Sequence, residues 1–369
     1  MWFLAVQNLV SEKTRFAFSA AGIGFSVFLL SILLGLYQGW NNKVGGFVKQ
    51  VDADIWIARQ GATDFIVAAS ILPDETVVEI GNRDGVQGAY PLLVRPMLFY
   101  NGTKETVMHL VGYDPETGIG GPLKCVKGSC EPKGNQIVVD EVLARTGGVD
   151  INDVLRSGDA SIDVIGYSSG GNFAFTTVGF MAIDDAKAFL QMGGLTTFVL
   201  VDLEEGADER AWISSIQEDT PNVVAFTRDE FTAATRRRIL DNVVPIIALI
   251  VGLAFVVGIA ITSLTVYTAT VEKTREFGVM KAIGFNNFDL FKLVLIQSLL
   301  IGLLGFVFGA TLTLILSRFV DLIVAQFIVF VRPIDILFVL VATLAMSGAA
   351  AIVPARRVGS LDPAVVFRG

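Results

Sequence analysis

Apolar residues gather in four long runs, and the region between the first and second runs has the mixed composition of a soluble domain. The runs cover residues 16–40, 242–271, 293–317 and 336–355. About 20 apolar residues cross the core of a bilayer, so each run predicts a transmembrane helix. A shorter apolar stretch, 319–333, contains Asp321. It predicts an interfacial hairpin at the outer face, and a fifth span is the alternative.

The first apolar run has basic residues before it, as a secretory signal peptide does. It is longer than the apolar part of such a peptide, and no small-residue cleavage site follows it. We therefore expect an uncleaved anchor. The predicted order is an amphipathic helix (1–15), span one (16–40), an outer domain with a stalk (41–240), span two (241–271), a charged loop (272–288), span three (289–318), an outer hairpin (319–335), span four (336–355) and a tail (356–369).

The segment between the first two spans predicts an α+β domain. β-branched runs bounded by Gly, Asp or Asn predict strands at 53–58, 136–140, 161–167 and 197–203. Helices are predicted at 140–147, 184–192 and 207–219, with Gly147 and Gly193 as carboxyl-terminal stops. Residues 228–241 contain no Gly or Pro and continue into the second span, which predicts a rigid helical stalk. Residues 41–50 are its expected partner.

Composition and charge support a membrane protein and set its orientation. Only 17% of the residues are charged, against about 25% in ordinary soluble proteins. If four spans alternate, three basic segments share one side, and the positive-inside rule makes that side the cytoplasm of the inner (plasma) membrane. Both termini are then cytoplasmic and the acidic 41–240 domain is outside. The basic residues are Lys13, Arg15, Lys273, Arg275, Lys281, Arg356, Arg357 and Arg368.

Three arginines depart from this rule. Arg236, Arg237 and Arg238 lie just before the second span, on the side assigned to the outside. Contact with outer-leaflet phosphates, or snorkelling at the end of a long helix, is the simpler interpretation. Gripping an anionic substrate is the alternative.

Two cysteines, Cys125 and Cys130, fall in a Gly-containing loop of the outer domain. An oxidising compartment favours a short-range disulfide between them, and two free thiols are the alternative. A metal site is not expected, because the only histidine, His109, is distant in sequence and two cysteines are too few ligands.

The chain carries none of the common catalytic motifs. It has no G-x-x-x-x-G-K-[ST] loop, no H-E-x-x-H and no G-x-S-x-G. The paired acids at 140–141 and 184–185 open predicted helices, where carboxylates favour the helix dipole. Almost no ionisable group lies deep in a span, which argues against an ion channel or a proton-coupled transporter. We expect a non-catalytic chain that binds no cofactor of its own and no nucleic acid.

A charged segment, VEKTREFGVMKAIGFNNF at residues 271–288, lies between the second and third spans. A membrane protein with a stalk and no nucleotide site must obtain energy elsewhere. This segment is therefore the expected docking place for a cytoplasmic ATPase.

The same segment and the carboxyl-terminal sequence carry a family resemblance. Residues 271–305 closely resemble the loop and third span of MacB/FtsX-type (type VII) ABC transporter permeases, and PARRVGSLDPAVVFR at 354–368 resembles their ending, with Phe367 where Leu is common. The start of the chain and the strand–helix QIVVDEVLARTGG are also similar. The resemblance implies a homodimer bound to two copies of an ATPase that binds ATP and Mg. By position, the implied ATPase-contacting residues are Glu272, Lys273, Arg275, Glu276, Phe277, Lys281, Ala282, Ile283 and Gly284.

The family contains several kinds of permease. DADIWIA at residues 52–58 is similar to the DevC-like branch, which implies export by mechanotransmission, either with a periplasmic adaptor and an outer-membrane duct or by release of an amphiphile from the membrane lipids. In that mechanism the spans pass ATP-driven motion to the outer domain, and no substrate crosses a central pore. FtsX-like signalling to a cell-wall hydrolase and lipoprotein extraction are the alternatives.

Overall fold

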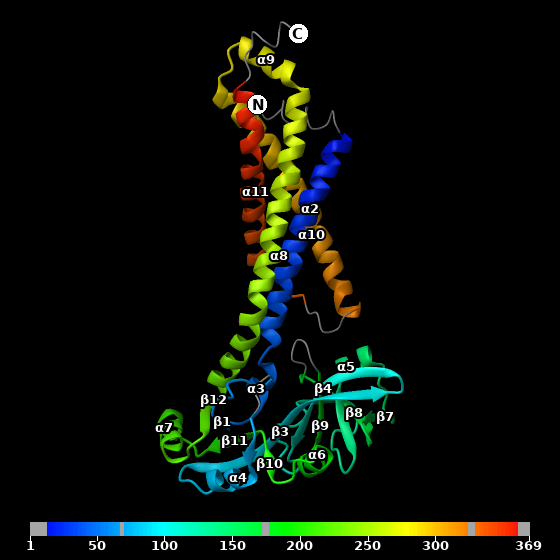
Figure 1. Cartoon of the computed structure of the whole chain (residues 1–369), viewed down its shortest axis with the longest axis vertical. Helices are drawn as coiled ribbons and strands as arrows, with labels where there is room; N and C mark the ends of the chain where they lie inside the picture. Colours follow the sequence, from blue (N-terminus) through cyan, green and yellow to red (C-terminus); the bar gives the residue numbers. More distant parts are fainter. Residues whose placement is uncertain (1–12, 67–69, 172–176, 324–328, 361–369) are drawn as a thin grey trace. The chain divides into compact units, whose positions relative to one another are not determined.

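The computed structural model describes residues 13–66, 70–171, 177–323 and 329–360 of the 369-residue chain. The chain divides into two compact units. One is helical and contains the chain before Gly39 and most of the chain after Asn242; the other, Gly39–Asn242, contains the strands. Figure 1 shows the long helices of the first unit and the sheet of the second.

Four helices among the described residues are long and apolar enough to cross a membrane. They are α2 (Lys13–Lys43), α8 (Arg228–Glu272), α10 (Asn287–Ile323) and α11 (Pro333–Gly359). A short helix, α9 (Thr274–Ala282), lies between α8 and α10. The predicted four-span architecture, with a sheet-rich domain inserted between the first two spans, is confirmed.

Glycines let the spans approach one another closely. A Cβ atom added at Gly305 of α10 would lie 2.6 Å from Ile23 Cγ2 and 3.1 Å from the Ala20 carbonyl oxygen of α2. One added at Gly22 would lie 2.8 Å from Ile261 Cγ2 of α8. Real Cβ atoms do not tolerate the shorter of these distances, so the crossings depend on the absence of side chains.

Several buried hydroxyl groups inside the helical unit donate hydrogen bonds to carbonyl oxygens of the bundle. Ser298 of α10 donates from Oγ to the Ser347 carbonyl oxygen of α11 over 2.6 Å, and both residues are buried. Thr262 and Thr343 donate to carbonyl oxygens one turn earlier in their own helices. These hydroxyls therefore need no water inside the bundle.

The outer unit is built on a mixed sheet that has ten strands within the described residues. Its main order is β12-β1-β11-β3-β4-β9-β6-β8-β5, and β7 pairs with β3 and β8. The neighbours β4 and β9 are parallel, as are β6 and β8, and the other pairs are antiparallel. The strands are β1 (Ile55–Arg59), β3 (Val86–Asn101), β4 (Lys104–Tyr113), β5 (Lys124–Gly128), β6 (Gln136–Asp140), β7 (Val154–Ser157), β8 (Ala160–Ser169), β9 (Thr177–Ala182), β11 (Phe198–Leu203) and β12 (Val223–Thr227).

Short helices and a small two-stranded ladder complete this unit. The ladder pairs β2 (Leu72–Pro73) with β10 (Leu195–Thr196). The helices are α3 (Gly46–Gln50), α4 (Asp74–Gly81), α5 (Glu141–Gly147), α6 (Ile183–Phe189) and α7 (Glu209–Asp219).

The amino-terminal end of α8 is anchored in an aromatic core of the outer unit. Phe231, which is fully buried, stacks on Trp56 of β1 with ring centroids 5.1 Å apart and packs edge-on against Phe198 of β11. The Arg228 amide donates to the Asp54 carbonyl oxygen over 2.9 Å, and the two side chains form an ion pair. The helix that becomes the second span is thus fixed to the sheet at its first turn.

Helix α3 supplies the expected partner of the stalk. It follows Gly45, whose φ of 81° lies in the left-handed region. A Cβ at Gly45 would meet the Thr232 side chain and carbonyl oxygen of α8 at 3.0 Å. Glycine is therefore required both by the backbone conformation and by the close approach to the stalk. The predicted helical stalk and its contact with residues 41–50 are both present.

The predicted elements of the outer domain match the structure with small shifts. The strand predicted at 136–140 is β6, and Asp140 caps α5 by accepting from the Val142 amide over 2.8 Å. The stop predicted at Gly147 falls one residue later, at Gly148, which has the positive φ. The stop predicted at Gly193 is wrong, because α6 already ends at Phe189 with backbone hydrogen bonds that close a tight turn.

The segment predicted as a charged loop, 272–288, contains helix α9 and two short connections. Residues 319–323 of the predicted outer hairpin continue α10, and 324–328 lie outside the described residues. Most of the predicted amphipathic helix (1–15) and of the tail (356–369) also lies outside them. The described part of the tail extends α11 to Gly359.

Candidate functional site

Helix α9 is held between the ends of two spans by sharp connections. Lys273 separates it from α8 with a non-helical ψ of 18°. At the other end, Ile283 closes the helix and Gly284 adopts a φ of 110°. Few residues other than glycine accept that conformation, so the Lys-Ala-Ile-Gly sequence ends α9 and turns the chain into α10.

Phe277 attaches α9 to the helical unit. Its side chain is 1% exposed and belongs to the same buried cluster as Leu290 and Val294 of α10 and Ala355 and Val358 of α11. The family resemblance implied a contact between Phe277 and the ATPase. In the structure the ring faces the bundle, so its direct role is to position α9.

Lys281 forms a second attachment. Its Nζ donates to the carbonyl oxygen of Gly359, the last residue of α11, over 2.8 Å. Carbonyl groups at a helix carboxyl terminus lack partners within the helix, and the helix dipole favours a cation there. Lys281 therefore joins α9 to the end of the fourth span.

The other residues expected to contact a partner form the outer surface of this region. Arg275, Glu276, Ala282 and Gly284 are exposed, and the Ile283 side chain is 74% exposed. A large apolar side chain with charges of both signs beside it is typical of a protein contact surface. Glu272 is exposed and Lys273 is half-buried at the junction with α8.

One further part of this surface was not predicted from the sequence. Phe288, in the first turn of α10, is 61% exposed, and the Lys292 ammonium lies 4.4 Å from its ring centroid. Phe288 closes the charged segment in the sequence, but nothing in the pattern separated its exposed ring from the buried ring of Phe277. We call Arg275, Glu276, Ile283 and Phe288 the α9 surface.

Among the described residues, no group of three or more His, Cys, Asp or Glu side chains is arranged to hold a metal ion. The acid pairs act as helix-opening groups: Asp140 caps α5, and Asp184 and Asp185 occupy the first turn of α6.

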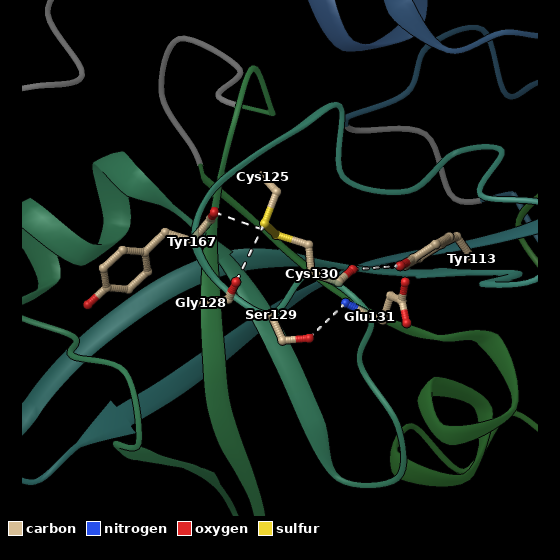
Figure 2. The surroundings of a disulfide bond; sticks show 7 residues. All are labelled: Tyr113, Cys125, Gly128, Ser129, Cys130, Glu131 and Tyr167. Atoms are coloured by element: carbon tan, nitrogen blue, oxygen red, sulfur yellow. Dashed lines mark hydrogen bonds between the residues drawn. A yellow bond between two sulfur atoms is a disulfide. The ribbon is translucent and has the colours of Figure 1, made fainter.

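Cys125 and Cys130 are joined by a disulfide at the edge of the sheet. Figure 2 shows the bond beside Gly128 and Tyr167, with the Tyr113 hydroxyl donating to the Cys130 carbonyl oxygen over 3.4 Å. All five residues of β5 are exposed, so the disulfide and the pairing with β8 hold this strand in place. Burial, and then the nearby Glu131, raises the pKa of Tyr113 to about 12.

Arg236, Arg237 and Arg238 lie on α8, close to the residue at which the helix leaves the outer unit. Arg237 and Arg238 are exposed and Arg236 is half-buried. They are far in the chain from the α9 surface and belong to a separate site.

The carboxyl-terminal part of the chain, residues 248–363, matches the family of FtsX-like permease C-terminal domains. The matched region contains α9 and the whole α9 surface.

Relatives of full length are similar across the whole chain. An uncharacterized ABC transporter permease of Mycobacterium tuberculosis strain CDC 1551 is 23% identical over 377 residues and covers 100% of both chains.

A second relative matches only part of the chain. The macrolide export ATP-binding/permease protein MacB of Acinetobacter baylyi is 31% identical over 126 residues, which are 34% of this chain and 18% of that protein.

One solved structure is similar to the outer unit at a low level. The periplasmic region of MacB from Actinobacillus actinomycetemcomitans aligns with a TM-score of 0.40 and 12% identity, covering 53% of this chain and 96% of that chain.

Proposed function

Because the chain belongs to the MacB/FtsX-type ABC transporter permeases, we propose that it couples ATP hydrolysis by a separate cytoplasmic ATPase to movement of its outer domain. The ATPase docks on the α9 surface from the cytoplasm of the inner (plasma) membrane, where both termini of the permease also lie. The observation that carries this proposal is the double attachment of α9 to the helical unit through Phe277 and Lys281.

The attachments convert docking into motion of the spans. Phe277 belongs to a buried cluster with residues of α10 and α11, and Lys281 is bound to the end of α11. The chain itself joins α9 to α8. A force applied to the exposed side of α9 is therefore applied to three spans at once.

Helix α8 would carry this motion from the membrane to the outer domain. It is one helix from Arg228 to Glu272, with Pro245 inside it, and its first turn is fixed to the sheet by Asp54, Trp56 and Phe198. Movement of α8 would reach the outer domain without a substrate path through the bilayer. This supports mechanotransmission, with export or extraction of an amphiphilic substrate as its outcome.

We also propose that the permease works as a homodimer through α8. Of the apolar windows in the four spans, that of α8 is 11% buried and the others are 28–33% buried. Gly252 lies on its exposed side, where a Cβ atom added to it would have no described atom within 4 Å apart from the adjacent backbone of its own helix. Small residues favour close helix–helix contact, so this face suits a second copy.

The experiment is a charge reversal on the α9 surface. The variant Arg275→Glu/Glu276→Arg is expected to abolish co-purification of the ATPase and its stimulated ATP turnover, with the outer domain still folded. The matched control, Glu209→Arg/Arg210→Glu, reverses an adjacent exposed pair at the start of α7 and should behave as the wild type. Normal binding and turnover in the first variant would overturn the proposal.

A further inference from the structure

The arginine cluster (Arg236, Arg237 and Arg238) has no anionic partner within the described part of the chain. None of the three forms an ion pair there. The Nε of Arg236 is buried and has no hydrogen-bond acceptor. Asp241 follows within one turn on the same helix and is exposed, but it pairs with none of them. The exposed guanidinium groups of Arg237 and Arg238 are thus available to an acceptor from outside the protein, and half-buried Arg236 adds a third positive charge beside them.

The position of the cluster along α8 places it at the level of lipid headgroups. The uncharged run 242–271 would be about 45 Å long as a straight helix, at 1.5 Å per residue. A bilayer including its headgroups is about 40–45 Å thick. The charged residues before and after this run therefore fall in the two headgroup layers. The arginine cluster belongs to the outer layer under the topology proposed above.

The exposed side of α8 changes from basic to apolar over a short distance. Arg237 and Arg238 are exposed, and Val244, Ile246 and Leu249 expose apolar side chains further along the helix. From Arg238 to Val244 the helix rises about 9 Å. Flexible arginine side chains span part of this distance, so the guanidinium groups and the first apolar residues can contact the phosphate and the chains of one lipid.

Consecutive helical residues point about 100° apart, so the three arginines surround much of the stalk rather than one edge of it. Guanidinium groups bind phosphate oxygens through paired, charge-assisted hydrogen bonds. We propose that Arg236, Arg237 and Arg238 form a binding site for the phosphate groups of anionic phospholipids in the outer leaflet. The bound lipids hold the stalk at a fixed height in the membrane. The proposal rests on the proposed topology and is independent of ATPase docking.

A membrane lipid fits this cluster better than a protein partner does. A partner's acidic residues would have to follow the arginines around about 200° of the helix surface, at the point where its exposed face becomes apolar. Lipid headgroups and acyl chains meet at that boundary in any case. Phosphatidylglycerol in place of phosphatidylcholine adds net negative charge without changing the acyl chains, so it isolates the electrostatic part of the contact.

The test uses the full chain reconstituted in vesicles of phosphatidylcholine with a minor fraction of phosphatidylglycerol. The lipids retained by the extracted protein are identified by native mass spectrometry. We expect the wild type to retain phosphatidylglycerol in several-fold excess over its share of the vesicle, and Arg236→Gln/Arg237→Gln/Arg238→Gln to lose this excess. The control Lys124→Gln/Lys127→Gln/Lys133→Gln removes three exposed positive charges from the outer domain and should retain it.

Each outcome decides the proposal. An unchanged excess in the arginine variant would overturn it, as would an equal loss in the lysine control. Loss of a co-purifying protein from the arginine variant, with its lipid excess intact, would assign the cluster to a protein partner instead. ATP turnover is measured after the ATPase is added to the same vesicles. A wild type that retains phosphatidylglycerol but stimulates no ATPase would contradict the proposed function and leave the lipid site standing.

Discussion

The ammonium of Lys281 lies 2.8 Å from the carbonyl oxygen of Gly359, which joins the end of α9 to the end of the fourth span. The two residues are 78 positions apart in the chain. Their contact explains how a short helix between two spans can also be tied to a third. It makes Lys281 a positioning residue of the α9 surface rather than part of that surface.

Replacing Lys281 with Met should uncouple the ATPase without preventing its binding. A hydrogen bond to a charged group contributes about 1.5–3 kcal/mol, and the loss frees one end of α9. We expect permease-stimulated ATP turnover to fall several-fold, with co-purification of the ATPase largely retained. Lys281→Arg keeps the charge and the donors and should recover most of the turnover. Full turnover in Lys281→Met would show that this attachment is not used.

Phe277→Ala should weaken the whole cytoplasmic end of the bundle. Truncating a fully buried Phe costs about 3–5 kcal/mol, because apolar contacts are lost and a cavity remains. The expected results are a lower unfolding temperature in detergent and loss of ATPase stimulation. Val279→Ala truncates an exposed neighbour on the same helix and is the control. Equal stability of the two variants would contradict the buried position of Phe277.

Two glycines on different helices should respond oppositely to the same substitution. Gly305→Val places a side chain against Ile23 and the Ala20 carbonyl oxygen, so it should separate α2 from α10 and lower the unfolding temperature. Gly252→Val meets no described atom outside the adjacent backbone of its own helix and should leave the single chain stable. If α8 forms the dimer contact, Gly252→Val should reduce the dimer fraction measured by cross-linking. A stable Gly305→Val variant would contradict the crossing.

The outer domain should lose stability as the pH rises from about 4 to about 6. Burial is the largest influence on Asp140 and raises its pKa from 3.8 to about 6, although the hydrogen bond from Val142 opposes the shift. The folded state therefore favours protonated Asp140. Its stabilising effect is complete below the unfolded pKa and is lost as the pH passes through the folded value. A shift of about two units corresponds to about 3 kcal/mol.

Hydrogen exchange of α5 in the full chain, corrected for intrinsic rates, measures this loss. Asp140→Asn keeps a capping oxygen and cannot ionise, so it should flatten the pH dependence. Asp202, whose pKa is also raised to about 6, first by burial and then by Asp54, acts in the same direction and should leave a residual slope. An unchanged pH dependence of stability in Asp140→Asn would show that Asp140 does not cause the loss.

The spans were predictable from the sequence because lipid requires long uncharged helices, whatever their partners. The strand β6 and the cap at Asp140 were predictable because β-branched residues and an acidic helix start are local signals. Long strands with weak local signals, such as β3 and β4, were not. Val86–Asn101 contains Pro91 and Pro96, and it becomes a strand through pairing with the adjacent strand β4 and with β11, which is distant in the chain.

The candidate site was also predictable from the sequence only in part. Charge and position identified the segment that contains α9, but they could not separate inward from outward residues. Phe277 and Phe288 are alike in sequence terms; one is buried and the other is exposed, because the connection at Gly284 sets how α9 meets α10. The contact between Lys281 and Gly359 was also hidden, because it depends on where the last turn of α11 lies relative to α9.

Hydrogen exchange of the outer domain in the assembled complex tests the central claim most directly. The permease and its ATPase are compared in nanodiscs without nucleotide and with ATP trapped by a hydrolysis-deficient ATPase. We predict that ATP changes the protection of β1, α3 and the first turns of α8 in the wild type. We predict no such change in Arg275→Glu/Glu276→Arg. Identical exchange of these elements in the wild type with and without ATP would contradict transmission through the spans.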